Sequence, residues 1–360
     1  MSLSLDHITV VSGGQTLIDD VSINLERGSM NVLLGPTLAG KTSLMRLMAG
    51  LDQPTSGRVL IDGRDTTGTP VRKRSVAMVY QQFVNYPSLT VFENIASPLR
   101  VARLARSEIE QRVSKAARLL GLEPLLKRLP SQISGGQQQR TAIARAIVKG
   151  ADVVLLDEPL ANLDYKLREE LREELPRIFK ESGAILVYAT TEPLEALLLG
   201  GNIATLSKGR LVEFGATPHV YHHTSLIESA RVFSDPPLNE AKITKGDGKI
   251  MFGDFHTVPA TGVLAQVPDG AYILAFRADI VALREAWPVS ITFEGRVAVA
   301  EISGSESFVH VVTGLGTLVC VETGVSRLQP GEMVALHVDA TRVFVFDHEG
   351  RRVATSPRMN

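Results

Sequence analysis

The sequence predicts two parts, an α/β domain over residues 1–235 and a small all-β domain over residues 236–360. Residues 153–156 and 185–188 are continuous apolar runs of strand length, which suit strands buried on both faces of a parallel sheet. Stretches with helical spacing lie between such runs. Beyond Asp235, short alternating runs recur between turn residues, a pattern typical of a small barrel or sandwich.

A helical subdomain is predicted inside the first part, over residues 83–150. Ser107 followed by Glu110 has the spacing of a capping box at a helix start. Apolar residues at helical spacing follow it, and Gly121 is suited to end the helix.

Composition excludes several classes of protein. The chain has 360 residues with 38 Lys and Arg against 39 Asp and Glu, so a surface for polyanions such as nucleic acid is not expected. The single cysteine, Cys320, lies in an apolar run and is expected to be buried. We find neither an 18-residue apolar run nor a signal peptide, so the chain is expected to be cytosolic and not to cross a bilayer by itself.

Residues 35–42, Gly-Pro-Thr-Leu-Ala-Gly-Lys-Thr, fit the phosphate-loop pattern G-x-x-x-x-G-K-S/T between an apolar strand and a helix. Backbone N–H groups of such a loop curl around phosphate oxygens, and the helix N-terminus adds its positive dipole end. Lys41 would bring a point charge to the β- and γ-phosphates, and the Thr42 hydroxyl would ligate Mg²⁺.

Two carboxylates directly follow the apolar run at residues 153–156. Asp157 would hold the metal through its water shell, and Glu158 would act as general base on the attacking water. Two solvated acids at a strand end are the alternative, but the phosphate loop favours the catalytic interpretation.

Residues 133–140, Ile-Ser-Gly-Gly-Gln-Gln-Gln-Arg, contain a third motif. Ser134 and Gln137 have capping-box spacing, so the simplest interpretation is a helix start. Gly135 and Gly136 weaken a helix in its first turn, yet they let a phosphate approach the backbone.

This segment resembles the signature motif of ABC ATPases, with Ile133 in place of the usual leucine. Gln81 resembles the Q-loop glutamine of that family, and residues 160–164 resemble its D-loop. Residues 86–94 are similar to the surface that importer ATPases offer to the coupling helix of the membrane subunit. Residues 275–279 and 304–306 resemble the C-terminal regulatory domain of carbohydrate-importer ATPases.

The resemblance implies an α/β P-loop nucleotide-binding domain with a helical subdomain, followed by an oligonucleotide-fold-like β domain. It implies ATP and Mg²⁺ as cofactors, with Glu158 as the catalytic residue. It implies metal contacts from Thr42, Gln81 and Asp157. The implied nucleotide contacts are Gly35, Pro36, Thr37, Leu38, Ala39, Gly40, Lys41, Thr42, Ser43, Gln81, Asp157 and Glu158 and, across a dimer interface on the partner's nucleotide, Ser134, Gly135, Gly136 and Gln137.

The implied partners are a second ATPase subunit, two transmembrane permease subunits contacted through Gln81–Asn94, and a periplasmic or lipid-anchored substrate-binding protein. The resemblance thus implies a peripheral protein on the cytoplasmic face of the cell membrane, powering uptake of a sugar, a polyol, glycerol or glycerol phosphate.

Two positions depart from the family pattern. Ser12 stands where relatives carry a ring that stacks on adenine, and Thr191 stands where they carry a histidine near the γ-phosphate. Both departures fall on the site built on this chain's own phosphate loop. They favour a heterodimer with a competent, related subunit, and a homodimer that tolerates Thr191 stays open.

Three other functions are alternatives to transport. A non-transport ABC ATPase would be expected to carry a coiled-coil insertion or two cassettes, and a P-loop GTPase would carry an Asn-Lys-x-Asp string; the sequence has none of these. A regulatory subunit with little hydrolysis differs from the transport motor in degree, and measured turnover separates the two.

Overall fold

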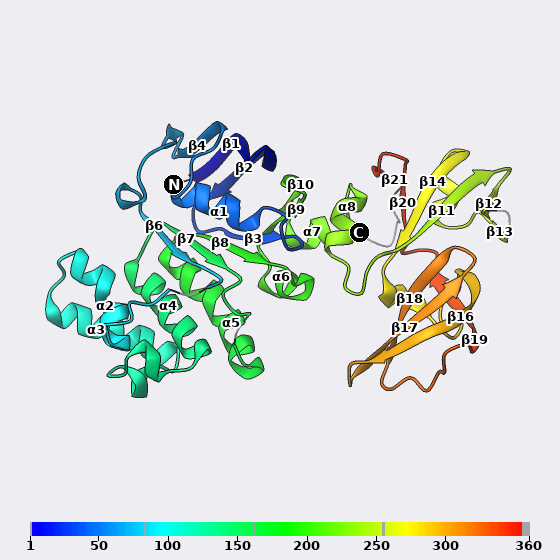
Figure 1. The fold of residues 1–360 in the computed structure, drawn as a ribbon. Helices are drawn as coiled ribbons and strands as arrows, with labels where there is room; N and C mark the ends of the chain where they lie inside the picture. The colour runs from blue at the N-terminus through cyan, green and yellow to red at the C-terminus, as the bar shows by residue number, and fades with distance from the viewer. Residues whose placement is uncertain (1, 83, 162, 254–255, 355–360) are drawn as a thin grey trace. The chain divides into compact units, whose positions relative to one another are not determined.

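The computed structural model describes residues 2–82, 84–161, 163–253 and 256–354. By its internal contacts the chain divides into two units, residues 1–218 and 219–360 (Figure 1). The first unit holds a four-stranded antiparallel sheet of order β2-β1-β4-β5. Its strands are β1 (Ser2–Ser12), β2 (Gln15–Glu26), β4 (Ser56–Ile61) and β5 (Arg64–Asp65).

The second sheet of this unit has six strands in the order β10-β9-β3-β8-β7-β6. Five strands run parallel, and β10 adds an antiparallel edge. Every residue of β7 and β8 is buried, as the continuous apolar runs predict. The strands are β3 (Met30–Leu34), β6 (Val76–Val79), β7 (Val153–Asp157), β8 (Ile185–Thr190), β9 (Asn202–Ser207) and β10 (Arg210–Ala216).

One apolar core joins the two sheets through α1 (Lys41–Ala49). Leu44 and Met48 of α1 are buried with Leu5 of the antiparallel sheet and with Leu33 and Leu155 of the parallel sheet. Because β3 and β7 are parallel, their carboxyl ends lie at the same edge of the sheet. This packing fixes the start of α1 near the end of β7.

Three helices form the helical subdomain, namely α2 (Val91–Val101), α3 (Arg106–Leu119) and α4 (Gly135–Lys149) (Figure 1). The capping box predicted from Ser107 and Glu110 is wrong, because Ala105 is the N-cap of α3. Glu110 instead accepts a 2.8 Å bond from Arg106, one turn earlier. The other helices of this unit are α5 (Tyr165–Ser182) and α6 (Pro193–Leu199), with short 3₁₀ turns at Val71–Lys73, Glu123–Leu125 and Pro130–Gln132.

None of the helices in the described part of the chain is long and apolar enough to cross a bilayer.

The second unit is built on two antiparallel sheets around a shared apolar core, so the predicted all-β domain is confirmed. Their orders are β13-β12-β11-β14-β20-β21 and β15-β19-β16-β17-β18. The strands are β11 (Asn239–Gly246), β12 (Lys249–Phe252), β13 (His256–Pro259), β14 (Gly270–Phe276), β15 (Val281–Ala282), β16 (Ser290–Ile302), β17 (Glu306–Thr313), β18 (Gly316–Thr323), β19 (Met333–Asp339), β20 (Phe344–Phe346) and β21 (Arg352–Ala354). The helix α9 (Val263–Gln266) and a 3₁₀ turn (Ala278–Ile280) also lie in this unit.

The sequence pattern changes near residue 235, whereas the contacts divide the chain between Pro218 and His219. The difference arises from α8 (Ile227–Val232), whose buried residues pack on Phe344 and Phe346 of the β domain. The preceding helix, α7 (Thr217–His222), spans the division. Arg277 lies 3.8 Å from the centroid of the Tyr221 ring and donates a 2.9 Å hydrogen bond to the Tyr221 carbonyl.

Replacing Arg277 with Met should loosen the attachment of α7 and α8 to the β domain. The variant loses a cation–π contact and a charged hydrogen bond, so we expect the second unit to be less stable by about 2 kcal/mol. The chain's single tryptophan, Trp287, lies in this unit and reports its unfolding in denaturant. The matched control is Lys242→Met, at an exposed position of β11. Equal stability of the two variants would contradict the role of Arg277.

Candidate functional site

Lys41 is a nearly buried cation at the start of α1, with 5% of its surface exposed. Its Nζ donates to the carbonyl oxygens of Gly35 at 2.7 Å and Pro36 at 3.0 Å. Burial lowers the pKa of Lys41, while the nearby Glu158 and Asp157 carboxylates oppose that shift. The ammonium is thus satisfied mainly by neutral groups of its own loop, which phosphate oxygens could replace.

The loop that leads into α1 runs close to β9. A Cβ on Gly35 would lie 2.5 Å from the backbone oxygen of Leu206, so only glycine allows this approach. Gly40, the N-cap of α1, has φ 102° in the left-handed region. Leu38 is also left-handed at φ 69°, and its side chain is 95% exposed on the loop.

Asp157 and Thr42 meet at the edge of the parallel sheet. The Thr42 hydroxyl donates a 2.8 Å bond to Oδ2 of Asp157, which is 2% exposed. Burial raises the pKa of Asp157, and the Thr42 hydrogen bond and the Lys41 charge oppose the rise. A hydroxyl and a carboxylate oxygen therefore lie side by side at the foot of the phosphate loop.

Glu158 follows β7 in a left-handed conformation at φ 44°. Its backbone N–H donates to the Ala189 carbonyl at 3.0 Å, and its Oε1 lies 4.0 Å from the Lys41 Nζ. The side-chain amide of Gln81 donates to Oε2 at 2.9 Å. Burial raises the pKa of Glu158, and the Lys41 charge opposes this. Thr42 thus contacts Asp157, and Lys41 and Gln81 contact Glu158, the next residue along the chain. The five predicted side chains are therefore brought to one place.

These side chains are suited to bind a magnesium ion that is also coordinated by nucleotide phosphates. The metal-binding candidates are one carboxylate, one hydroxyl and one amide oxygen, all of which are hard ligands. Mg²⁺ is usually bound by one or two carboxylates plus substrate phosphates, with water completing the shell. No group of three or more His, Cys, Asp and Glu that could form an all-protein metal site occurs among the described residues.

The signature segment begins α4. Ser134 is the N-cap, its hydroxyl accepts from the Gln137 N–H at 3.3 Å, and Gln137 Oε1 accepts from the Ser134 N–H at 3.0 Å. The predicted capping box is therefore confirmed. Gly135 and Gly136 form the first turn. The hydrogen bonds recorded for Ser134 and Gln137 are local to this helix, and within the described residues none reaches the phosphate loop.

The segment that resembles a D-loop lies between β7 and α5. Its Asp164 is the N-cap of α5 and accepts from the Leu167 N–H at 3.1 Å. Arg168 donates to the Ala161 carbonyl at 3.4 Å. Asn162 lies outside the described residues.

Ser12 and Thr191 lie on strand ends. Ser12 is the last residue of β1, is exposed, and pairs with Gln15 across the β1–β2 turn. Thr191 directly follows β8 and is half-buried.

Sequence reasoning missed the buried cluster beneath Thr191. Glu195 is 5% exposed and accepts hydrogen bonds from the hydroxyls of Tyr188 at 2.7 Å and Thr190 at 2.5 Å. The Thr190 hydroxyl also accepts from the Glu192 N–H at 3.0 Å. The sequence does contain one signal for this cluster, the glutamate among the apolar residues of α6. A buried glutamate needs hydrogen-bond donors nearby.

Known proteins resemble this chain in sequence. Residues 18–161 match the ABC transporter family, and residues 290–345 match the TOBE domain. The trehalose/maltose import ATP-binding protein MalK of Thermococcus litoralis is 34% identical over 354 residues, which cover 94% of this chain and 95% of that protein. This chain belongs to the ABC transporter ATP-binding proteins.

Other members of the ABC family match over nearly the whole chain or over part of it. The sn-glycerol-3-phosphate import ATP-binding protein UgpC 3 of Agrobacterium fabrum is 33% identical, covering 98% of this chain and 99% of that protein. The dimeric structure of MJ0796, a bacterial ABC transporter cassette, has 29% identity and a TM-score of 0.56. It covers 60% of this chain and 98% of its own. A related structure of the same cassette is bound to ADP and Pi.

Replacing Gly35 with Ala tests the close approach of the phosphate loop to β9. The new methyl group meets backbone and not a flexible side chain, so the loop must shift. A misplacement of about 1 Å typically costs on the order of 100-fold, and we expect that loss in kcat/KM for ATP. Gly314→Ala is the control, because its Cβ meets no atom within 4 Å. Normal kcat/KM in the Gly35 variant would refute the steric argument.

Proposed function

We propose that this chain hydrolyses ATP with Mg²⁺ and drives uptake of a sugar, a polyol, glycerol or glycerol phosphate through separate membrane subunits. The main support is that Thr42 contacts Asp157 while Lys41 and Gln81 contact the neighbouring Glu158, in a chain that resembles import ATP-binding proteins over 94% of its length. Relatives named for trehalose/maltose, glycerol 3-phosphate and xylose/arabinose import all match at least 94% of the chain.

In this proposal each side chain has one task. The loop N–H groups and Lys41 bind the β- and γ-phosphates, with Lys41 leaving the carbonyls of Gly35 and Pro36. Thr42, Asp157 and Gln81 would hold Mg²⁺, and the bound ion would neutralise phosphate charge. Glu158 accepts the proton of the attacking water, and burial supports this by raising its pKa.

Glu158→Gln removes the proposed base and keeps the size of the side chain. We expect turnover to fall by at least about 100-fold, the usual range for loss of a general base, while Mg·ATP still binds. Steady-state hydrolysis and equilibrium binding of a fluorescent ATP analogue measure the two effects. Glu173→Gln, on the exposed face of α5, should change neither. Full turnover in the Glu158 variant would exclude it as the base.

The proposal also includes a second ATPase subunit, which pairs with this chain. Ser134, Gly135, Gly136 and Gln137 would contact nucleotide held by that subunit, and its own signature segment would contact nucleotide held here. The dimeric cassette structures support a paired arrangement. Ser12 and Thr191 both belong to the site on this chain's phosphate loop, so we favour a related, competent subunit over a second copy.

Thr191→His tests that preference. Threonine is shorter than histidine and carries no charge, so the isolated chain should hydrolyse ATP slowly, and histidine should accelerate it by on the order of 100-fold. The measurement is turnover of the purified chain and of the variant over a range of protein concentrations. Family-typical turnover of the unmodified chain, unchanged by Thr191→His, would favour the homodimer.

The proposed location is the cytoplasmic face of the membrane. There the segment Gln81–Asn94 would contact the permease subunits, which work with a substrate-binding protein. Val84 and Tyr86, which are 62% and 50% exposed, provide apolar surface on this segment. Of this segment, Phe83 lies outside the described residues.

A further inference from the structure

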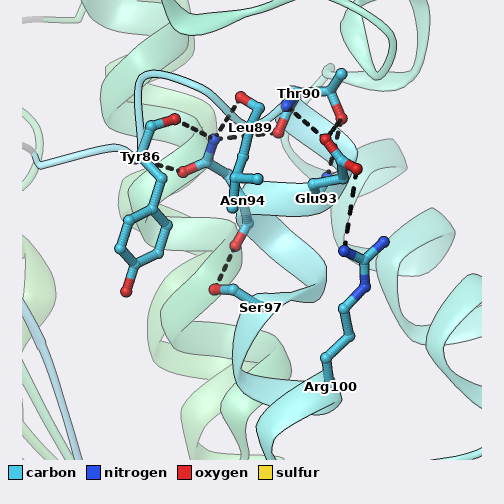
Figure 2. A network of polar contacts seen from close by, with 7 residues as sticks. All are labelled: Tyr86, Leu89, Thr90, Glu93, Asn94, Ser97 and Arg100. Atoms are coloured by element: carbon cyan, nitrogen blue, oxygen red, sulfur yellow. Dashed lines mark hydrogen bonds and ion pairs between the residues drawn. The ribbon is translucent and has the colours of Figure 1, made fainter.

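Asn94 and Glu195 are buried polar side chains of the first unit that each fix a turn of the backbone. The contacts of Asn94 lie at the start of α2 (Figure 2). Its side chain accepts from the Tyr86 N–H at 2.8 Å and donates to the carbonyls of Tyr86, Leu89 and Thr90. The bonds drawn there join residues of one local segment. Glu195 reaches further, because its bonds end on a central strand of the nucleotide-binding sheet.

Glu195 links α6 to the end of β8. It is 5% exposed and accepts hydrogen bonds from the hydroxyls of Tyr188 at 2.7 Å and Thr190 at 2.5 Å. An ionised carboxylate is an acceptor only, so it accepts both bonds at once. Burial, and then the Glu195 charge, raise the pKa of Tyr188 well above its usual range, so this hydroxyl keeps the proton that it donates.

Thr190 passes the restraint on to the turn that follows β8. Its hydroxyl donates to Glu195 and accepts from the Glu192 N–H at 3.0 Å. Because the hydroxyl has a single proton, the bond to Glu195 leaves its lone pairs free to accept from the backbone. Thr191 lies between the two residues that this bond joins. The position of its side chain is therefore fixed by the Thr190 hydroxyl.

The end of β8 lies between the two halves of the proposed site. Thr190 pairs with Leu34, the residue before the phosphate loop, and Ala189 pairs with Asp157 on the other side. The Ala189 carbonyl also accepts from the Glu158 N–H at 3.0 Å. A shift at the end of β8 would therefore move the proposed general base and the phosphate loop relative to each other.

Charged groups from several elements act on this cluster. Burial is the main cause that raises the pKa of Glu158, the Lys41 charge opposes the rise, and the Glu195 carboxylate adds to it. Removing the Glu195 charge should therefore lower the pKa of Glu158. Other charged groups that act on Glu158 or Tyr188 are Asp157, Glu192, which lies 3.6 Å from Arg168, and Arg172.

We propose that Glu195 is a positioning residue for ATP hydrolysis. By holding the Thr190 hydroxyl it fixes the end of β8, and through that strand end it places the Glu158 backbone and the Thr191 side chain at the nucleotide site. Glu195 itself acts only through these residues. The proposal rests on the proposed function and adds a residue on which the geometry of the reaction depends.

Amide hydrogen exchange tests the anchoring without nucleotide. Glu195→Gln replaces one of two accepting oxygens with a donor, and Thr190→Val removes a hydroxyl at nearly constant size. Each variant should exchange the N–H groups of Glu158 and Glu192 at least about fivefold faster, because the bonds that hold them open more often. The matched control is Thr205→Val on β9, which also loses a buried hydroxyl that accepts a backbone N–H and should leave both amides unchanged.

Single-turnover hydrolysis, with protein in excess over Mg·ATP, measures the consequence for the reaction. A misplacement of about 1 Å typically costs on the order of 100-fold, so Glu195→Gln and Thr190→Val should each slow the step by at least about tenfold. Mg·ATP binding should stay within about twofold, and Thr190→Ser, which keeps the hydroxyl, should recover most of the rate. Only Glu195→Gln should move the acidic limb of the rate profile to lower pH, because it alone removes a charge that raises the pKa of Glu158.

The outcomes separate the two proposals when all variants are measured well below their melting temperatures. Unchanged exchange in both Glu195→Gln and Thr190→Val would overturn the anchoring. Faster exchange with an unchanged rate of hydrolysis, or a loss of rate that Thr205→Val shares, would overturn the positioning role and leave Glu195 a purely structural residue. Absence of hydrolysis by the unmodified chain would count against the proposed function, and the exchange rates would still decide the anchoring.

Discussion

The arrangement of the site depends on one buried cation, Lys41, at the junction of β3 and α1. The parallel sheet places the end of β7 beside it, so Asp157 and Glu158 meet a positive charge and a helix N-terminus. Without a ligand, the ammonium is held by the carbonyls of Gly35 and Pro36, and the carboxylates are partly held by Thr42 and Gln81. Burial disfavours the charged forms of Lys41, Asp157 and Glu158. Because these groups are poorly solvated, bound phosphate and metal would interact strongly with them.

Helix α4 connects the site to its surroundings. Gln139 of α4 donates to the carbonyl of Pro159, the residue after Glu158. Further along α4, Arg145 holds the Val84 carbonyl in the segment proposed to face the membrane subunits. A displacement of α4 would therefore be felt both beside the proposed general base, Glu158, and at Val84. This is a physical route by which events at the nucleotide could reach a membrane partner.

Much of this was predictable from the sequence because the motifs are local. The phosphate loop and the helix start at Ser134 are set by residues within a few positions of one another, and the buried strands follow from continuous apolar runs. The Glu195 cluster, the contact of Arg145 with the Val84 carbonyl and the division at residue 218 were missed. They depend on contacts between segments distant in the chain or on which element a helix packs against, and no local pattern records these. Ser107 shows the converse, since a local capping pattern lost to the ion pair of Arg106 with Glu110.

A crystal structure of this chain with Mg²⁺ and a non-hydrolysable ATP analogue tests the central claim most directly. The account predicts that the Lys41 Nζ leaves the carbonyls of Gly35 and Pro36 and lies within about 3 Å of β- and γ-phosphate oxygens. It also predicts a metal ion ligated by the Thr42 hydroxyl, with Asp157 directly or through water beside it. A nucleotide bound elsewhere, with Lys41 still on both carbonyls, would contradict the account.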